Sequence, residues 1–87
     1  MPVHSAAVDE RFVSLKKSLS ENLRKRRLAK GFSQEALALS ADVDRTYVSQ
    51  IERGVGNPSL LVLFKLALIL DAEVGQLLTP IETLQRK

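Results

Sequence analysis

The chain has 87 residues, of which 45% are hydrophobic and 26% charged, a balance typical of one small globular domain rather than a disordered segment. It contains no cysteine, which excludes disulfides and thiolate metal sites, and its only histidine is His4, near the start. With a formal net charge of +3 and no carboxylate pair in an evident pocket, the sequence predicts no catalytic residue, metal, cofactor or small-molecule ligand.

The N-terminal third is expected to form a tail and one long helix. Residues 1–8 indicate a flexible tail without the basic head and apolar run of a signal peptide. Apolar residues then recur every three or four positions, which predicts a helix over residues 9–30, ended by Gly31. The stripe consists of Val8, Phe12, Leu15, Leu19 and Leu23. We expect Phe12 and Leu15 to cover the core rather than to serve a partner.

Basic residues are concentrated in the same third of the chain. Residues 1–32 carry eight Lys and Arg against three Asp and Glu. This excess suits a polyanionic partner, although a solvated helix face would have the same composition.

Residues 34–53 have the pattern of two short helices joined by a tight turn. The apolar side chains at helical spacing are Leu37, Ala38 and Ala41 before the turn and Val48 and Ile51 after it. Within the turn, Asp42 tolerates the left-handed conformation at modest cost, and Asp44 is a good N-cap. The small side chain of Ala38 lets the two helices cross closely. This arrangement predicts a helix-turn-helix.

The second helix of this motif would direct hydrogen-bonding side chains outward. These candidate base-reading residues are Arg45, Thr46, Ser49 and Gln50. An α-helix fits the major groove of DNA, where Arg45 suits guanine, Thr46 a base edge or a thymine methyl, and Gln50 either adenine or a brace for Arg45. We expect Asp44 to cap the helix rather than to read a base, whereas Tyr47 suits either the edge of the core or a phosphate.

Residues 59–70 predict a helix with more apolar surface than its own domain can bury. Ser59 is its expected N-cap. The expected inward stripe consists of Leu60, Leu63, Leu66, Ala67 and Leu70. Leu61, Phe64 and Leu68 form a second apolar face, which we interpret as a homodimer interface. The alternative is that the first helix or the C-terminal residues cover this face.

The end of the chain is expected to add short helical segments. A fifth helix would turn Val74, Leu77 and Leu78 inward. Residues 80–87 then predict a short C-terminal helix or tail, whose Ile81 and Leu84 would join the dimer interface. Since Lys65 interrupts the most apolar stretch, which is too short to span a bilayer, we expect no membrane partner and a cytoplasmic, nucleoid-associated protein.

These motifs carry a resemblance to a known family. The residues from Ser33-Gln34-Glu35 to Gly54, followed by Asn57-Pro58-Ser59-Leu60, resemble the Cro/repressor (XRE-type) helix-turn-helix family, and most closely its restriction–modification controller proteins. The resemblance implies an all-α, lambda-repressor-like DNA-binding domain of five to six helices over residues 9–79, here with a first helix that begins several turns early. Asp42 and Asp71 depart from the glycines that the family favours, so we expect slight strain at Asp42.

The resemblance also assigns roles to individual residues. It implies an ion pair between Arg27 and Glu52, which would tie the first helix to the recognition helix. It implies that Gln34, at the start of the second helix, donates to a DNA phosphate or base edge and is not a structural residue. The other phosphate candidates are Ser33, which also suits an N-cap, and Tyr47, Arg53 and Asn57.

The leading functional hypothesis is a sequence-specific transcriptional regulator that binds double-stranded DNA as a homodimer on a near-palindromic operator. Such a protein would act by blocking RNA polymerase or by contacting it. Resemblance to the controller proteins implies autoregulation and control of restriction–modification genes. The alternatives are a phage-type repressor or an antitoxin of a toxin–antitoxin pair and, in another class, a helical protein-interaction module. The polar residues Arg45 and Thr46 argue against the last.

Overall fold

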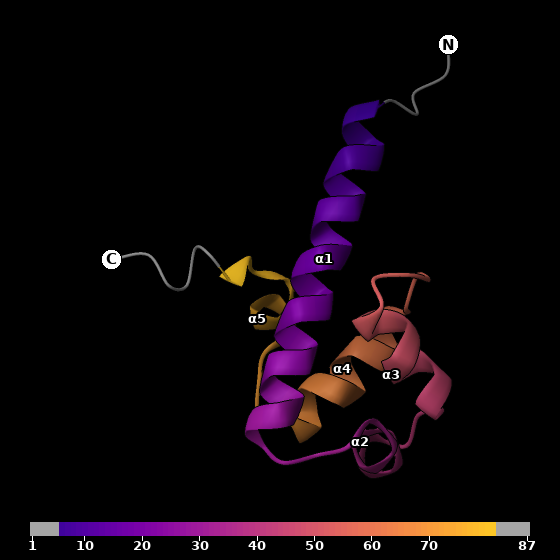
Figure 1. Cartoon of the computed structure of the whole chain (residues 1–87), viewed down its shortest axis with the longest axis vertical. Coiled ribbons are helices and arrows are strands. Elements are labelled where there is room, and N and C mark those ends of the chain that lie inside the picture. The colour runs from indigo at the N-terminus through magenta and orange to yellow at the C-terminus, as the bar shows by residue number, and fades with distance from the viewer. Residues whose placement is uncertain (1–5, 82–87) are drawn as a thin grey trace.

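The apolar periodicities of the sequence produce an all-helical structure in the computed structural model, which describes residues 6–81 (Figure 1). In chain order the helices are α1 (Ala6–Ala29), α2 (Gln34–Ala41), α3 (Arg45–Glu52), α4 (Leu60–Ile69) and α5 (Val74–Leu78). No strand occurs within residues 6–81, so the predicted fold class is confirmed. Ile81 is helical, whereas Leu84, the other residue expected in a last helix, lies outside the described residues.

The first helix is longer than the sequence pattern suggested, and its start is less buried. It begins at Ala6, so residues 6–8 are helical rather than part of a tail. Its N-terminal half extends beyond the other helices (Figure 1). Phe12 and Leu15 remain 39% and 41% exposed, so the expectation that they cover the core is wrong. The helices that hold the core lie beside the C-terminal half of α1, where Leu19 and Leu23 are buried.

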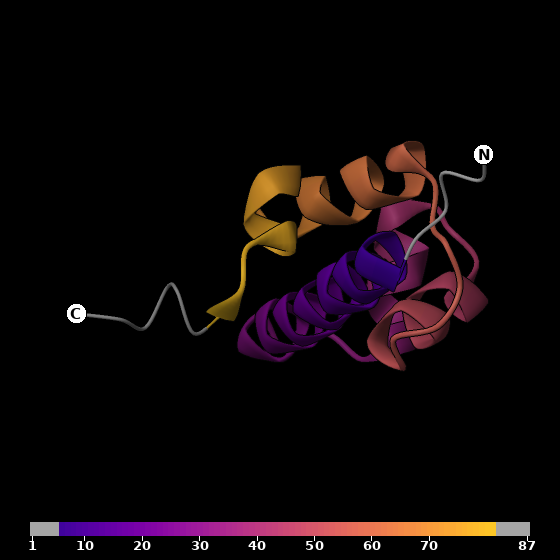
Figure 2. The ribbon, with the colours of Figure 1, turned by 90° about the horizontal axis from the view of Figure 1, so that it is seen from above.

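One hydrophobic core is shared by all five of these helices. The largest fully buried side chains come one from each helix: Leu23, Leu37, Val48, Leu66 and Leu77. Seen from above, α4 and α5 lie along one side of α1 and α3 lies along the other (Figure 2). The second helix closes the arrangement by packing on both α3 and α4. No helix among the described residues is long and apolar enough to cross a membrane.

The first four helices end in the same backbone motif. In each, one residue adopts a left-handed conformation: Gly31, Asp42, Gly54 and Asp71, with φ of 79°, 58°, 74° and 55°. The next N–H then donates to the carbonyl five residues back, as Val43 does to Ala38 at 3.0 Å. Two aspartates therefore take the place of glycine, at the modest cost that this residue type has in the left-handed region.

The buried stripe of α4 differs at one position from the expected one. Leu63, Leu66, Ala67 and Leu70 are buried as predicted, and Ser59 caps the helix by accepting from the Val62 N–H at 3.1 Å. Leu60, however, is 73% exposed, so its assignment to the inward stripe is wrong. As the first residue of the helix it lies at the rim of a groove beside Phe12 and Leu15 of α1 rather than over the core.

A buried asparagine joins the two ends of the fold. The Asn22 side chain is 2% exposed, and its Nδ2 donates to the carbonyls of Ser18, Leu77 and Thr79 at 2.9, 3.1 and 2.6 Å. The last two carbonyls lie in the last turn and at the C-cap of α5, where a helix leaves its final acceptors without intrahelical partners. Asn22 therefore fixes the end of α5 on α1, a role that its sequence position did not indicate.

We predict that Asn22→Ala lowers the free energy of unfolding by about 1–3 kcal/mol, because buried carbonyl groups lose their donor. Urea denaturation followed by circular dichroism measures this loss. Ser14→Ala, on an exposed position of the same helix, is the control and should change stability by less than about 0.5 kcal/mol. Equal stability of the two variants would mean that Asn22 does not hold α5.

Candidate nucleic-acid interface

Both helices of the helix-turn-helix begin at a capping side chain. Ser33 Oγ accepts from the Ala36 N–H at 2.9 Å, and Asp44 Oδ1 accepts from the Thr46 N–H at 2.8 Å. The bond from the Thr46 backbone lowers the pKa of Asp44 below its ordinary value. At the end of α2, Asp42 has φ 58° and ψ 49°, the left-handed conformation expected of it. Asp42 and the Asp44 cap make 34–53 two separate helices rather than one.

The third helix has an apolar side in the core and a polar side facing outward. Val48 and Ile51 are 0% and 3% exposed and anchor it from behind. The four candidate base-reading residues lie on the rest of its surface: Arg45 and Thr46 are exposed, and Ser49 and Gln50 are half-buried. Tyr47 is 44% exposed, and it borders a small hollow together with Gln50 and the loop that follows α3.

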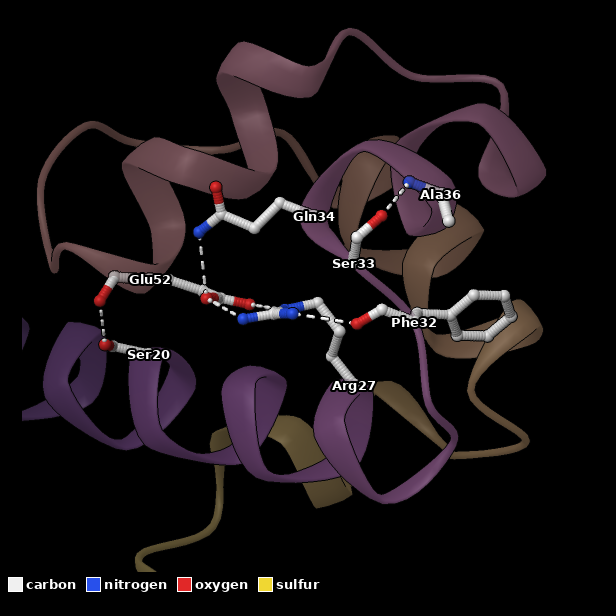
Figure 3. Close-up of polar contacts among 7 residues, drawn as sticks. All are labelled: Ser20, Arg27, Phe32, Ser33, Gln34, Ala36 and Glu52. Carbon is white, nitrogen blue, oxygen red and sulfur yellow. Dashed lines mark hydrogen bonds and ion pairs between the residues drawn. The ribbon is translucent and has the colours of Figure 1, made fainter.

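Arg27 and Glu52 form a bidentate ion pair that connects α1 to α3 (Figure 3). Arg27 Nε lies 2.6 Å from Glu52 Oε2, and Arg27 Nη2 lies 2.9 Å from Oε1. The remaining Nη1 donates to the Phe32 carbonyl at 2.8 Å, in the segment between α1 and α2. The two side chains are only 8% and 2% exposed. The hydrogen bond with Glu52 raises the pKa of Arg27 above its ordinary value.

Two further residues complete the polar cluster around Glu52 (Figure 3). Gln34 Nε2 donates to Glu52 Oε1 at 3.1 Å, and Ser20 Oγ donates to the Glu52 backbone carbonyl at 2.7 Å. The expectation that Gln34 is not a structural residue is therefore wrong: its amide holds the carboxylate, because the start of α2 lies beside the end of α3. Sequence reasoning missed Ser20 altogether, since no local pattern relates residues 32 positions apart.

The remaining phosphate candidates are on the surface around α3. Ser33, Arg53 and Asn57 are exposed, at the start of α2, at the end of α3 and in the following loop. Not every basic residue of the N-terminal third is available to a polyanion. Arg27 is committed to Glu52, and Lys30 Nζ lies 2.5 Å from Asp71 Oδ2.

The outer face of α4 is left uncovered by the part of the chain that the structure describes. Leu61, Phe64 and Leu68 are 60%, 53% and 62% exposed. Neither α1 nor residues 70–81 fold over them. Within the described residues, no other segment of the chain therefore covers this face. Ile81 is half-buried and borders a surface hollow beside α1 with Asn22.

Comparison with known proteins shows that the region around the helix-turn-helix is similar to known helix-turn-helix proteins. A family model of helix-turn-helix domains, HTH_3, matches residues 23–77. A hypothetical transcription factor of Neisseria meningitidis is 44% identical over 66 residues, which are 76% of this chain; the match spans 62% of that protein's length. The control protein C.SmaI of Serratia marcescens is 40% identical over 68 residues, which cover 78% of this chain and 81% of C.SmaI.

Solved structures show the same arrangement of helices. The restriction–modification controller protein C.AhdI of Aeromonas hydrophila has 45% identity and a TM-score of 0.67, covering 71% of this chain and 94% of C.AhdI. The biofilm regulator SinR of Bacillus subtilis, solved in complex with DNA, has 37% identity and a TM-score of 0.67, covering 70% of this chain and 98% of that one. The residues of α1 before 23 lie outside the family model.

We predict that Glu52→Ala lowers the free energy of unfolding by about 3–5 kcal/mol, because it leaves the Arg27 guanidinium buried without a counter-charge. Thermal and urea melts measure the loss. Glu35→Ala, an exposed carboxylate on α2, is the control and should have little effect.

Replacing both partners, as in Arg27→Met with Glu52→Leu, should recover much of the loss, because no charge then remains buried. A Glu52→Ala loss no larger than that of Glu35→Ala would show that the pair does not stabilise the contact between α1 and α3.

Proposed function

The chain belongs to the HTH_3 family of helix-turn-helix DNA-binding transcriptional regulators, and we propose that it binds a near-palindromic operator as a homodimer and controls restriction–modification genes together with its own. The observation that carries the proposal is α3, whose back is buried through Val48 and Ile51 while its outer side is polar. The family is one of DNA-binding regulators rather than enzymes.

The outer side of α3 is proposed to enter the major groove. Arg45, on the first turn, donates to guanine O6 and N7, and Thr46 contacts a neighbouring base edge or a thymine methyl group. Ser49 and Gln50, one turn further on, read the next positions. Because both Arg45 and Thr46 are exposed and Asp44 caps the helix before them, the N-terminal turn of α3 is presented without rearrangement of the core.

Phosphate contacts are proposed to position this helix on the duplex. The capped N-terminus of α2 at Ser33 offers backbone N–H groups and a favourable dipole for one phosphate. Arg53 and Asn57, exposed around the loop after α3, and the Tyr47 hydroxyl bind others. Such contacts set orientation and contribute to affinity on any sequence, whereas the base contacts of α3 set preference.

The uncovered face of α4 is proposed as the dimer interface. Leu61, Phe64 and Leu68 make an apolar patch whose burial against a second copy removes it from water. A two-fold axis there would place two copies of α3 on one side of the DNA, about 34 Å apart, so that they read two half-sites one helical turn apart. Ile81 and Leu84 are proposed to extend this contact.

Similarity to C.SmaI and C.AhdI supports the proposed regulatory role. The proposed action is through the place that the protein occupies on DNA, at the bacterial nucleoid, where it blocks RNA polymerase or contacts it beside a promoter. Binding to its own upstream region would make the control autoregulatory. The test is selection of preferred sites from random duplexes, followed by gel shifts on the upstream region of its own gene. Absence of any preferred sequence would contradict the proposal.

We predict that Arg45→Ala relaxes the preference at one base pair of the operator by about 1–3 kcal/mol, because a bidentate contact to that pair is lost. Arg53→Ala should instead weaken binding to all sequences alike and reduce the slope of log K against log salt by about 0.9, the share of one phosphate. Fluorescence anisotropy on operator and random duplexes at several salt concentrations separates the two. Equal losses on random DNA from both variants would contradict this division of roles.

We predict that Leu61→Asp with Leu68→Asp produces a monomer with weakened operator binding, because charges replace the apolar patch of α4. Sedimentation velocity measures the change of mass. Leu39→Asp is the matched control, since Leu39 is 81% exposed on α2 and outside the patch. Persistence of a dimer in the double variant would place the interface elsewhere.

A further inference from the structure

The side chain of Gln50 lies against the loop that follows its own helix. It is half-buried and borders a small hollow with Tyr47, Val55 and Asn57. The loop is tied to the same residue, because the Val55 N–H donates to the Gln50 backbone carbonyl at 3.0 Å. The loop therefore lies next to both parts of Gln50. It is hydrogen-bonded to the backbone and lies beside the side chain.

This contact depends on the absence of a side chain at Gly56. A Cβ added to Gly56 would lie 3.3 Å from Gln50 Oε1, 3.7 Å from Gln50 Cβ and 3.9 Å from Gln50 Cδ. The first of these distances is shorter than an ordinary van der Waals contact, so the Gln50 amide would have to move. Gly56 also has φ of 81°, a conformation that L-residues rarely adopt.

No hydrogen bond within residues 6–81 holds the Gln50 amide. Gln34 shows the contrast, because its amide is committed to Glu52 at 3.1 Å. The donor and acceptor of the Gln50 amide are therefore unused within these residues, and its Oε1 lies next to the position that a side chain at Gly56 would occupy. A methyl group at Gly56 would therefore displace this amide by a few tenths of an ångström.

We propose that Gly56 is a specificity-determining positioning residue, which lets the Gln50 amide lie along the 54–57 loop in the direction that reads its base pair. This inference rests on the proposed function, in which Gln50 contacts a base. A bidentate contact needs two aligned hydrogen bonds, and their strength falls steeply when the angles or distances depart from the optimum. A shift of the amide therefore alters the preference at one base pair and leaves phosphate contacts unchanged.

The chain contains a matched control for the backbone strain that a substitution at Gly56 would introduce. Gly54 has φ of 74° in the same loop, but a Cβ added there would have no atom within 4 Å. Gly54→Ala and Gly56→Ala thus share an unfavourable backbone conformation, and only Gly56→Ala touches Gln50. Any difference in base preference between the two variants reports on that contact.

The experiment measures affinity for the selected operator, for its single-base-pair variants and for random duplex, at a temperature at which circular dichroism shows every protein folded. We expect Gly56→Ala to reduce the preference for the operator base pair at one position by a factor of at least about five. This factor is the lower limit for the loss of a bidentate contact. Its affinity for random duplex should match that of Gly54→Ala, which keeps the original preference. If Gly56→Ala does not fold, Gly56→Asn and Gly54→Asn repeat the comparison, because Asn tolerates positive φ better.

Gln50→Ala, alone and combined with Gly56→Ala, separates the two levels of the proposal. In the Gln50→Ala protein, Gly56→Ala should cause no further change of preference. If Gln50→Ala leaves the preference at every base pair unchanged, the base-reading role of Gln50 in the proposed function fails. If Gln50→Ala alters the preference but Gly56→Ala behaves like Gly54→Ala, the base-reading role stands and the role of Gly56 is overturned.

Discussion

The ion pair of Arg27 with Glu52 is the contact on which the position of α3, the proposed DNA-reading helix, depends. Burying two charges is costly unless each finds all its partners, and here the surroundings supply them. The guanidinium binds both carboxylate oxygens and the Phe32 carbonyl, and the carboxylate also accepts from Gln34. One cluster thus joins α1, the segment before α2, the start of α2 and the end of α3. Its directional bonds fix the relative orientation of these elements, which apolar packing alone constrains less sharply.

The two glutamines of the helix-turn-helix illustrate how position decides the use of a side chain. Gln34 starts α2 and lies beside the end of α3, so its amide is used inside the protein. Gln50 has the same chemical groups but lies on the outer side of α3 next to a loop without side chains at Gly54 and Gly56. Its amide makes no hydrogen bond within residues 6–81, and we propose that it contacts a base. One short motif therefore contains one glutamine amide that is hydrogen-bonded inside the protein and one that is not.

The N-terminal half of α1 is helical with little tertiary packing. Extending a helix from a packed segment costs much less than nucleating one, and Leu19 and Leu23 provide that segment. Local contacts add to this, such as the Lys16 ammonium 4.9 Å from the centre of the Phe12 ring. All of this half precedes the residues that the family model matches. It leaves the Phe12 and Leu15 side chains at a groove beside Leu60.

The sequence by itself determined the helices, their caps and the helix-turn-helix, because these depend on neighbours three or four residues apart. Asp44 and Ser59 cap as expected, and Val48 and Ile51 are buried as their spacing predicts. The Arg27–Glu52 pair followed from family resemblance rather than from spacing.

Only the tertiary structure decided which long-range partners meet. The bonds of Asn22 to the end of α5, the commitment of Gln34 to Glu52 and the exposure of Leu60 could not be predicted. The physical reason is that a residue's periodicity states which side of its own helix it occupies, whereas its partners depend on how separate helices are placed around the shared core.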